Sequence, residues 1–299
     1  MAELRHELEQ ATTAAEEKYN NALARLAQQR DEQTAANQQR HNEQCRDLRT
    51  VHDREWESLA ARWFDGYNAI RQSWQNLETQ CERLFPDWET TDERAWPRPT
   101  NTPAAIRFGR VGLDLANVKH GLSEDERLRP PTTVAELPAL MTLQEHPVMV
   151  ITAEEEGRRA AVDVLQTMML RLLTAMPPGK VRFTILDPVG LGESFASFMH
   201  LADYDEQLIS GRIWTESRQI EEQLTRLTAH METVLQKYLR NQFATIDDYN
   251  VAAGEVAEPF QVLVAANFPA NFSEAAARKL ISIGTSGPRC GVYTLLSVD

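Results

Sequence analysis

The stretch "HPVMVITAEEEGRRAAVDVLQTMML", residues 146–170, decides the fold. Residues 148–152 are a short apolar run, which predicts a buried strand, and from Arg158 to Ala175 the apolar side chains recur at helical spacing. A strand, a tight turn and a helix in this order form the layout in which many proteins hold a phosphate group. The turn, AEEEGRR, carries three acids where a phosphate site needs glycines and a lysine.

The alternation of strands and helices continues to the end of the chain. Further strands are predicted at "VRFTILD" (181–187), "FQVLVAA" (260–266) and "GVYTLLSV" (291–298). A long amphipathic helix is predicted over Gln219–Phe243, with Leu235 and Tyr238 on its inward face, and a shorter helix opens at Ser273, a good N-cap residue. Apolar strands separated by amphipathic helices indicate a parallel sheet with helices on both faces, and such sheets bind ligands at the carboxyl ends of their strands.

Residues 1–85 have a different composition. Up to residue 84 there is no proline and one glycine, Gly66, and Ala, Glu, Gln, Arg and Leu are abundant, which predicts a helix. Apolar or small residues step by four and three in the manner of a coiled-coil seam: Leu8, Thr12, Ala15, Tyr19, Ala22 and Leu26. The seam resumes between Trp56 and Leu84. We expect a coiled-coil arm whose second half packs on a globular body or on a partner helix.

Residues 86–145 are expected to be a linker and a small β or irregular segment, which leaves 146–299 as the α/β domain. Within the segment, "AIRFGRVGLDL" (105–115) predicts a hairpin or two short strands, and "VAELPALMTL" (134–143) predicts a short helix or turn. The paired acids Asp203/Asp205 and Asp247/Asp248 are expected to be solvated surface.

Composition excludes several classes of function. A net charge of -13 argues against broad electrostatic attachment to nucleic acid or to anionic membranes. The sequence contains no run of eighteen apolar residues, so we expect no membrane insertion. The three cysteines are far apart and the seven histidines are scattered, so we expect reduced thiols, no metal site and a cytoplasmic location.

Four segments occur in the same order as the motifs of a known family. They are "KVRFTILDPVGLGESFASFMHLAD" (180–203), "HMETVLQKYLRNQFATIDDYN" (230–250), "EPFQVLVAANFPANF" (258–272) and "RKLISIGTSGPRCGVYTLLSVD" (278–299). Together they resemble the motor domain of the FtsK/SpoIIIE family of DNA translocases, in the HerA/FtsK superfamily. In that family a strand ends in Asp-Pro-Lys, where this chain has Asp187 and Pro188. Met231-Glu232 and Tyr249-Asn250 match two later motifs. The resemblance implies a RecA-like fold with its phosphate loop between Val148 and Val162.

The chain departs from the family at each position that carries chemistry. The lysine of Asp-Pro-Lys is Val189, and Asn267 with Phe268 stands where the family has its acidic pair. The degenerate phosphate-loop positions are Glu156, Gly157, Arg158, Arg159, Ala161 and Val162, the last two falling where spacing places the lysine and serine. Because phosphoryl transfer depends on these groups, the resemblance implies a degenerate module with no catalytic residue and no bound cofactor.

The family's sheet continues beyond the strand that closes this chain, so we expect a longer protein in which a downstream motor module binds ATP and magnesium. In that reading the full-length protein is an ATPase that contacts DNA, and residues 1–85 bind a protein partner or self-associate. Two alternatives stay open. Arg158 or Arg159 could replace the lysine in a divergent active ATPase, or the chain could be a coiled-coil scaffold unrelated to DNA.

Overall fold

The computed structural model describes residues 2–89, 96, 98–145, 147–240 and 242–299. Its contacts divide the chain into two compact units. The first unit comprises the helix up to Arg71 together with Lys119–Pro131, and the second comprises Gln72–Val118 and Thr132–Asp299. Within the described residues, no helix combines the length and the apolar character needed to cross a bilayer.

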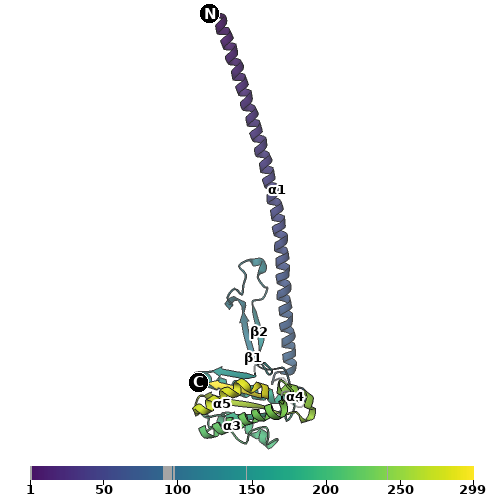
Figure 1. The fold of residues 1–299 in the computed structure, drawn as a ribbon, viewed down its shortest axis with the longest axis vertical. Helices are drawn as coiled ribbons and strands as arrows, with labels where there is room; N and C mark the ends of the chain where they lie inside the picture. The colour runs from purple at the N-terminus through teal and green to yellow at the C-terminus, as the bar shows by residue number, and fades with distance from the viewer. Residues whose placement is uncertain (1, 90–95, 97, 146, 241) are drawn as a thin grey trace. The chain divides into compact units, whose positions relative to one another are not determined.

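Helix α1, Ala2–Leu84, is a single unbroken helix, as the composition predicts (Figure 1). Its side chains from Leu4 to Glu55 are exposed except that of Cys45, which is partly covered. An isolated helix gains little stability in water unless it buries an apolar face. The coiled-coil pairing of this arm stays a prediction, as does the division of the chain at residues 85 and 145.

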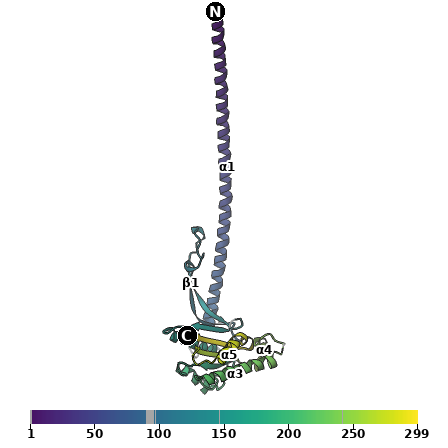
Figure 2. The ribbon, with the colours of Figure 1, turned by 60° about the vertical axis from the view of Figure 1, so that its left-hand side comes forward.

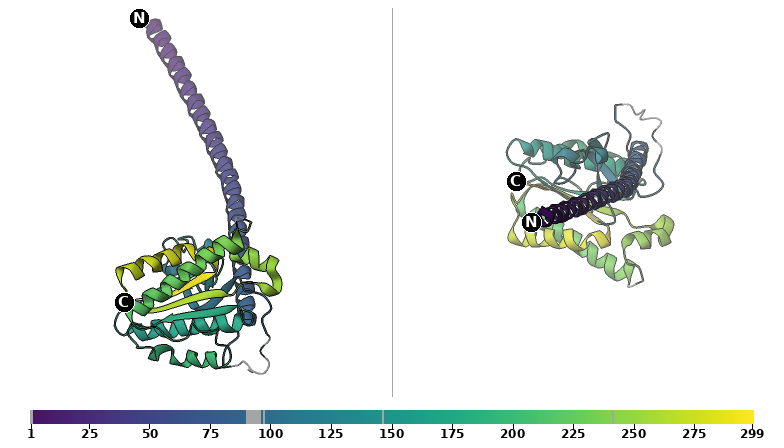
Figure 3. Two further views of the ribbon diagram at one scale, coloured as in Figure 1. Left: turned by 60° about the horizontal axis from the view of Figure 1, so that its bottom comes forward. Right: turned by 90° about the horizontal axis from the view of Figure 1, so that it is seen from above.

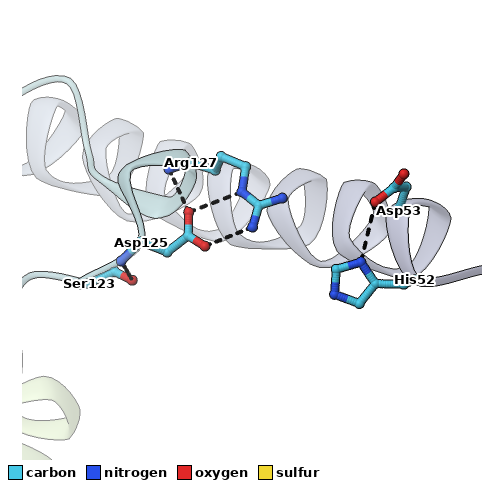
Figure 4. A network of polar contacts seen from close by, with 5 residues as sticks. All are labelled: His52, Asp53, Ser123, Asp125 and Arg127. Carbon is cyan, nitrogen blue, oxygen red and sulfur yellow. Dashed lines mark hydrogen bonds and ion pairs between the residues drawn. The ribbon is translucent and has the colours of Figure 1, made fainter. Parts of the chain in front are cut away.

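In the first unit, the segment 119–131 contacts α1 at Trp56. The guanidinium carbon of Arg127 lies 4.4 Å from the centre of the Trp56 ring. Asp125 holds that guanidinium in place by accepting from its Nε at 3.1 Å and from its Nη2 at 2.8 Å (Figure 4). These hydrogen bonds lower the pKa of Asp125. We call residues 119–131 the clasp.

The small β segment is one long antiparallel pair. Strand β1, Ala105–Asp114, pairs along its whole length with β2, Val134–Thr142. Both predictions for this region were wrong in detail: Ala105–Asp114 is one strand, and Val134–Thr142 is a strand in place of a helix or turn. Pairing with β1 outweighs the local propensity of "VAELPALMTL", and a shift of register between Arg107 and Gly109 accommodates the irregular pattern.

The end of α1 is built into the second unit. Cys81 and Phe85 are buried, and burial raises the pKa of the Cys81 thiol. Arg171 is also buried, with its guanidinium carbon 4.2 Å from the ring centre of Trp88. Its Nη1 donates to the Pro86 carbonyl at 3.0 Å. Within the second unit, the last turn of α1 and the residues after it are therefore held by an aromatic and arginine cluster.

The α/β body contains a parallel sheet in the order β3-β6-β5-β4. The strands are β3 (Val148–Thr152), β4 (Val181–Leu186), β5 (Phe260–Phe268) and β6 (Val292–Val298). Every predicted strand of this sheet is present. Strand β6 lies between β3 and β5, so β3 and β4 are the outer strands. The backbone of residues 208–214 covers the outer edge of β4.

Helices cover both faces of the sheet, as predicted. Helix α2, Gly157–Ala175, lies on one face, and α3 (Ser217–Thr233) and α5 (Glu274–Ser286) lie on the other (Figure 3). Helices α3 and α5 are side by side (Figure 2). Their apolar faces and the two faces of the sheet form one continuous core.

The predicted helix over Gln219–Phe243 changes type before it ends. After α3, residues Val234–Leu239 form a π-helical turn (η5). The wider turn shifts the side chains around the axis, so Val234 is buried while Leu235, predicted to point inward, is 38% exposed. Helix α4, Ile246–Ala253, follows with a capping box between Thr245 and Asp248.

Short 3-10 helices complete the described chain. They are η2 (Leu115–Asn117), η3 (Glu126–Leu128), η4 (Glu193–Asp203), η6 (Gly254–Val256) and η7 (Pro288–Cys290).

Candidate functional site

The turn that joins β3 to α2 lies at the carboxyl edge of the sheet. Four residues, Ala153–Glu156, separate the end of β3 from Gly157, the first residue of α2. The three glutamates are exposed, and Glu155 has a positive φ of 37°. The backbone N–H of Ala153 donates to the Val298 carbonyl at 2.9 Å, which anchors the turn to β6.

The first backbone N–H groups of α2 form hydrogen bonds with carbonyl groups of the preceding turn. The N–H of Gly157 donates to the Glu154 carbonyl at 2.8 Å, and that of Arg158 donates to the Glu155 carbonyl at 3.3 Å. In a phosphate loop these groups must point at the phosphate oxygens. Three carboxylates around the positive end of the helix dipole would also repel an anion.

Arg158 is held by a carboxylate from the neighbouring strand end. Its Nε donates to Oδ1 of Asp299 at 2.7 Å, and its Nη2 donates to Oδ2 of the same group. The pair is bidentate, with side-chain exposures of 46% and 36%. Arg159 is exposed. Asp299 thus takes the place beside Arg158 that a bound anion would need.

The other two phosphate-loop positions lie farther along the helix. Ala161 and Val162 are in the second turn of α2, where Ala161 is buried and Val162 packs against the core. A lysine at position 161 would have to enter the interface between the helix and the sheet, where an unpaired ammonium is costly.

Asp187 and Pro188 follow β4 at the same edge. Asp187 is fully buried; its N–H donates to the Trp214 carbonyl at 2.9 Å, and its Oδ1 accepts from the Gly190 N–H at 2.9 Å. Its Oδ2 is buried with no hydrogen-bond partner among the described residues. A side chain at position 190 would collide with this carboxylate, since a Cβ there would lie 2.5 Å from Oδ2. Asp187 therefore shapes a tight turn in which only glycine fits.

Asn267 is near the end of β5. It is buried, it has a positive φ of 56°, and its N–H donates to the Ser297 hydroxyl at 2.8 Å. An amide can accept a hydrogen bond but cannot act as a general base or neutralise a magnesium ion. Phe268 packs edge-on against Phe272 at 5.1 Å. This strand end therefore presents an amide and an aromatic ring, without a carboxylate at either position.

The parallel sheet brings the ends of β3, β4, β5 and β6 to one edge, as the sequence predicts for the candidate residues. Sequence reasoning missed Asp299, Ser297 and Asn271. Asn271 donates from Nδ2 to the Thr215 carbonyl at 3.3 Å and joins the loops after β4 and β5. Asp299 directly follows a predicted apolar strand, and this position at a strand end could have marked it as a candidate site residue.

A cavity of about 500 Å³ lies at the opposite edge of the sheet, near the amino ends of β4 and β5. Its lining includes Lys180, Asp247 and Asn250. Lys180 Nζ donates to the Ala257 carbonyl at 2.7 Å, and the Asn250 amide both donates to and accepts from the Glu258 backbone. Burial, followed by the nearby Asp248 charge, raises the pKa of Asp247. Asp247 is therefore not the freely solvated acid that the sequence suggested.

Among the described residues, no three His, Cys, Asp or Glu side chains are close enough together to form a metal centre.

The strand order and the turn between β3 and α2 define a RecA-like α/β module. The model of the FtsK/SpoIIIE family matches residues 128–293, more than half of the chain, and the chain belongs to that family. No protein of curated function matches the sequence.

Three solved structures are similar. They are the cytoplasmic domain of the type VII secretion ATPase EccC from Thermomonospora curvata (18% identity, TM-score 0.47), the pCW3 conjugation coupling protein TcpA with ATPgS (14%, 0.43), and EssC (ATPases 2 and 3) from Geobacillus thermodenitrificans (14%, 0.43). The matches cover 73%, 70% and 68% of this chain but 24%, 51% and 35% of those chains, so this chain spans about a quarter to a half of their length.

Proposed function

We propose that this chain is a non-catalytic FtsK/SpoIIIE-type module that supports the assembly or docking of an active motor. The observation that carries the proposal is that hydrogen-bond donors of the turn after β3 are already bonded within the chain. Its first two helix donors are bonded to Glu154 and Glu155, and Arg158 is bonded to Asp299. These two donors and the Arg158 guanidinium are therefore used within the chain.

The frame of the loop supports the same conclusion. A phosphate loop has the pattern G-x-x-x-x-G-K-[ST], with its second glycine at the start of the helix. Counted from Gly157, the first residue of α2, the chain has Thr152 at the first glycine, Arg158 at the lysine and Arg159 at the hydroxyl position. This count differs from the spacing along the sequence, which places the lysine and serine three residues later, at Ala161 and Val162. Arginine cannot replace the magnesium-binding hydroxyl of a serine or threonine.

ATP and magnesium therefore do not fit this edge of the sheet. Beyond the loop, the strand end at Asn267 has no carboxylate to position a metal or an attacking water. We infer that ATP and magnesium bind in a separate motor module of a longer protein and that any DNA contact belongs to that protein as a whole. A net charge of -13 supports placing DNA binding elsewhere. The three free thiols in the described chain support a reducing, cytoplasmic compartment.

The arm serves assembly in this proposal. Helix α1 keeps large apolar side chains exposed along its length, among them Leu8, Tyr19 and Leu26. A helix with such a face is stabilised by packing on another protein surface. We propose that residues 1–85 bind a protein partner or a second copy of the chain.

Ligand-linked melting tests the proposal. A nucleotide that binds only the folded chain would stabilise it by about 2.7 kcal/mol at a hundredfold excess over its Kd. We expect no change in Tm with millimolar ATP and magnesium. The matched variant Thr152→Gly/Arg158→Lys/Arg159→Thr restores the loop pattern and shows whether these three positions alone prevent binding. A clear rise in the Tm of the wild-type chain, with turnover, would instead establish a divergent ATPase.

A further inference from the structure

The first eight turns of α1 carry an apolar seam that the described chain leaves open. Leu8, Tyr19 and Leu26 are 68%, 66% and 62% exposed. Thr12, Ala15 and Ala22 complete the seam and are exposed as well. Beyond Leu26 the same seam positions are occupied by Gln29 and Gln33, so the apolar part ends there.

The seam is symmetric about residue 17. Leu8 and Leu26 are equally far from that residue, and the same holds for Thr12 with Ala22 and for Ala15 with Tyr19. A second copy that runs in the opposite direction places these residues in shared layers. We propose that residues 4–30 of α1 pair with the same residues of a second copy as an antiparallel coiled coil. The proposal rests on the assembly role of the arm and names its partner.

Side-chain size favours this direction. In the antiparallel arrangement Tyr19 lies opposite Ala15 of the second copy, and Leu8 lies opposite Leu26. In the parallel arrangement Tyr19 would meet Tyr19 while Ala15 met Ala15, which leaves one layer crowded and another underfilled. Close packing penalises both defects.

Charge favours the same direction. Residues 4–17 contain four acids and one base, whereas residues 18–30 contain three bases and no acid. Antiparallel pairing brings the acidic half of one copy alongside the basic half of the other. Parallel pairing would place like-charged halves side by side, and it would also align the two helix dipoles unfavourably.

The clasp is compatible with this pairing because it acts farther along the arm. Within the first unit, Arg127 of the clasp covers Trp56, which lies beyond the end of the proposed coiled coil. The clasp therefore leaves residues 4–30 accessible to the second copy.

Disulfide trapping in the full chain tests the pairing and its direction. The background carries Cys45→Ser, and Cys81 and Cys290 are buried. Leu8→Cys and Leu26→Cys are made separately, mixed, equilibrated and oxidised mildly. In the proposed dimer position 8 meets position 26, and the two copies of position 8 are about 27 Å apart. We expect the mixture to cross-link at least tenfold more than either variant alone.

The outcomes separate the possibilities. Efficient cross-linking of Leu8→Cys by itself would establish a parallel pair, and a monomeric mass at all concentrations would exclude self-association; either result overturns the proposal. Leu48→Cys, exposed but outside the seam, is the control and should not cross-link with Leu8→Cys. In sedimentation, Leu8→Glu/Leu26→Glu should weaken the dimer by more than roughly tenfold, while Leu48→Glu should not. These readouts do not involve nucleotide, so they fail or succeed independently of the proposed lack of ATP binding.

Discussion

Arg158, the second residue of α2, is paired with Asp299 at the end of β6, with 2.7 Å between Nε and Oδ1. The pair joins the helix that follows the candidate loop to the strand that neighbours β3. Because both side chains are more than one-third exposed, solvent screens the pair and its contribution is modest.

A double-mutant cycle should measure this pair. We expect Arg158→Ala and Asp299→Asn each to lower the free energy of unfolding slightly, with a coupling of about 0.5 kcal/mol that decreases at high salt. The measurement is urea denaturation at low and high ionic strength. The same cycle for Arg218 and Glu222, an exposed pair within α3, gives the baseline. Additive effects at low salt would show that the pair is absent in solution.

Gly190 should tolerate no side chain. In Gly190→Ala the new Cβ must displace the buried Asp187 carboxylate from its hydrogen bond with the backbone, so we expect a loss of about 1–3 kcal/mol. Gly284→Ala is the matched control, because position 284 is inside α5 with open space around it. That change should stabilise the chain by about 0.5–1 kcal/mol. Similar Tm values for the two variants would contradict the tight turn at Asp187.

The clasp should protect α1 from local opening around Trp56. Arg127→Ala removes the cation over the indole ring, so amide hydrogen exchange should become faster in residues near Trp56 and stay unchanged near Leu26. Arg129→Ala is the control, since Arg129 pairs with Glu126 inside the clasp itself. Equal exchange in wild type and Arg127→Ala would mean that the contact is not populated.

Asp247 gives a prediction about pH. Because burial raises its pKa, the folded chain favours the neutral acid, and that stabilisation is lost as the pH rises through the folded-state pKa. At pH 7 the charged form is disfavoured, so Asp247→Asn should raise Tm by about 1–3 °C, and the difference should vanish below about pH 4. Asp248→Ala should lower Tm, because alanine removes the acceptor of the Thr245 N–H in the capping box. A drop in Tm for Asp247→Asn at pH 7 would contradict the assigned pKa shift.

The regular parts of the fold could be predicted because their patterns are local. The apolar runs at Val148–Thr152 and Phe260–Phe268 and the N-cap at Ser273 each depend on a few adjacent residues. The strand β2 could not be predicted, because "VAELPALMTL" becomes a strand only by pairing with β1, whose paired residues lie at least twenty positions earlier. The π-helical turn at Val234 was also missed, since a heptad-like pattern contains no sign of one extra residue in a turn.

The candidate site was predicted in position but not in its contacts. Topology places Gly157, Asp187 and Asn267 at one edge of the sheet once the strands are known. The pairing of Arg158 with Asp299 could not be derived from the sequence. It forms because β6, which ends next to Asp299, lies beside β3 in the sheet. The two backbone bonds that close the turn depend on the positive φ of Glu155 and the neighbouring backbone, which composition does not encode.

Isothermal titration of the chain with ATP and magnesium tests the central claim most directly. We predict no heat of binding beyond dilution at protein concentrations that would detect a Kd of about 0.1 mM, because the loop donors and Arg158 are already bonded within the chain. Saturable binding in the micromolar range, abolished by Arg158→Ala, would contradict the account and establish the turn after β3 as a working nucleotide site.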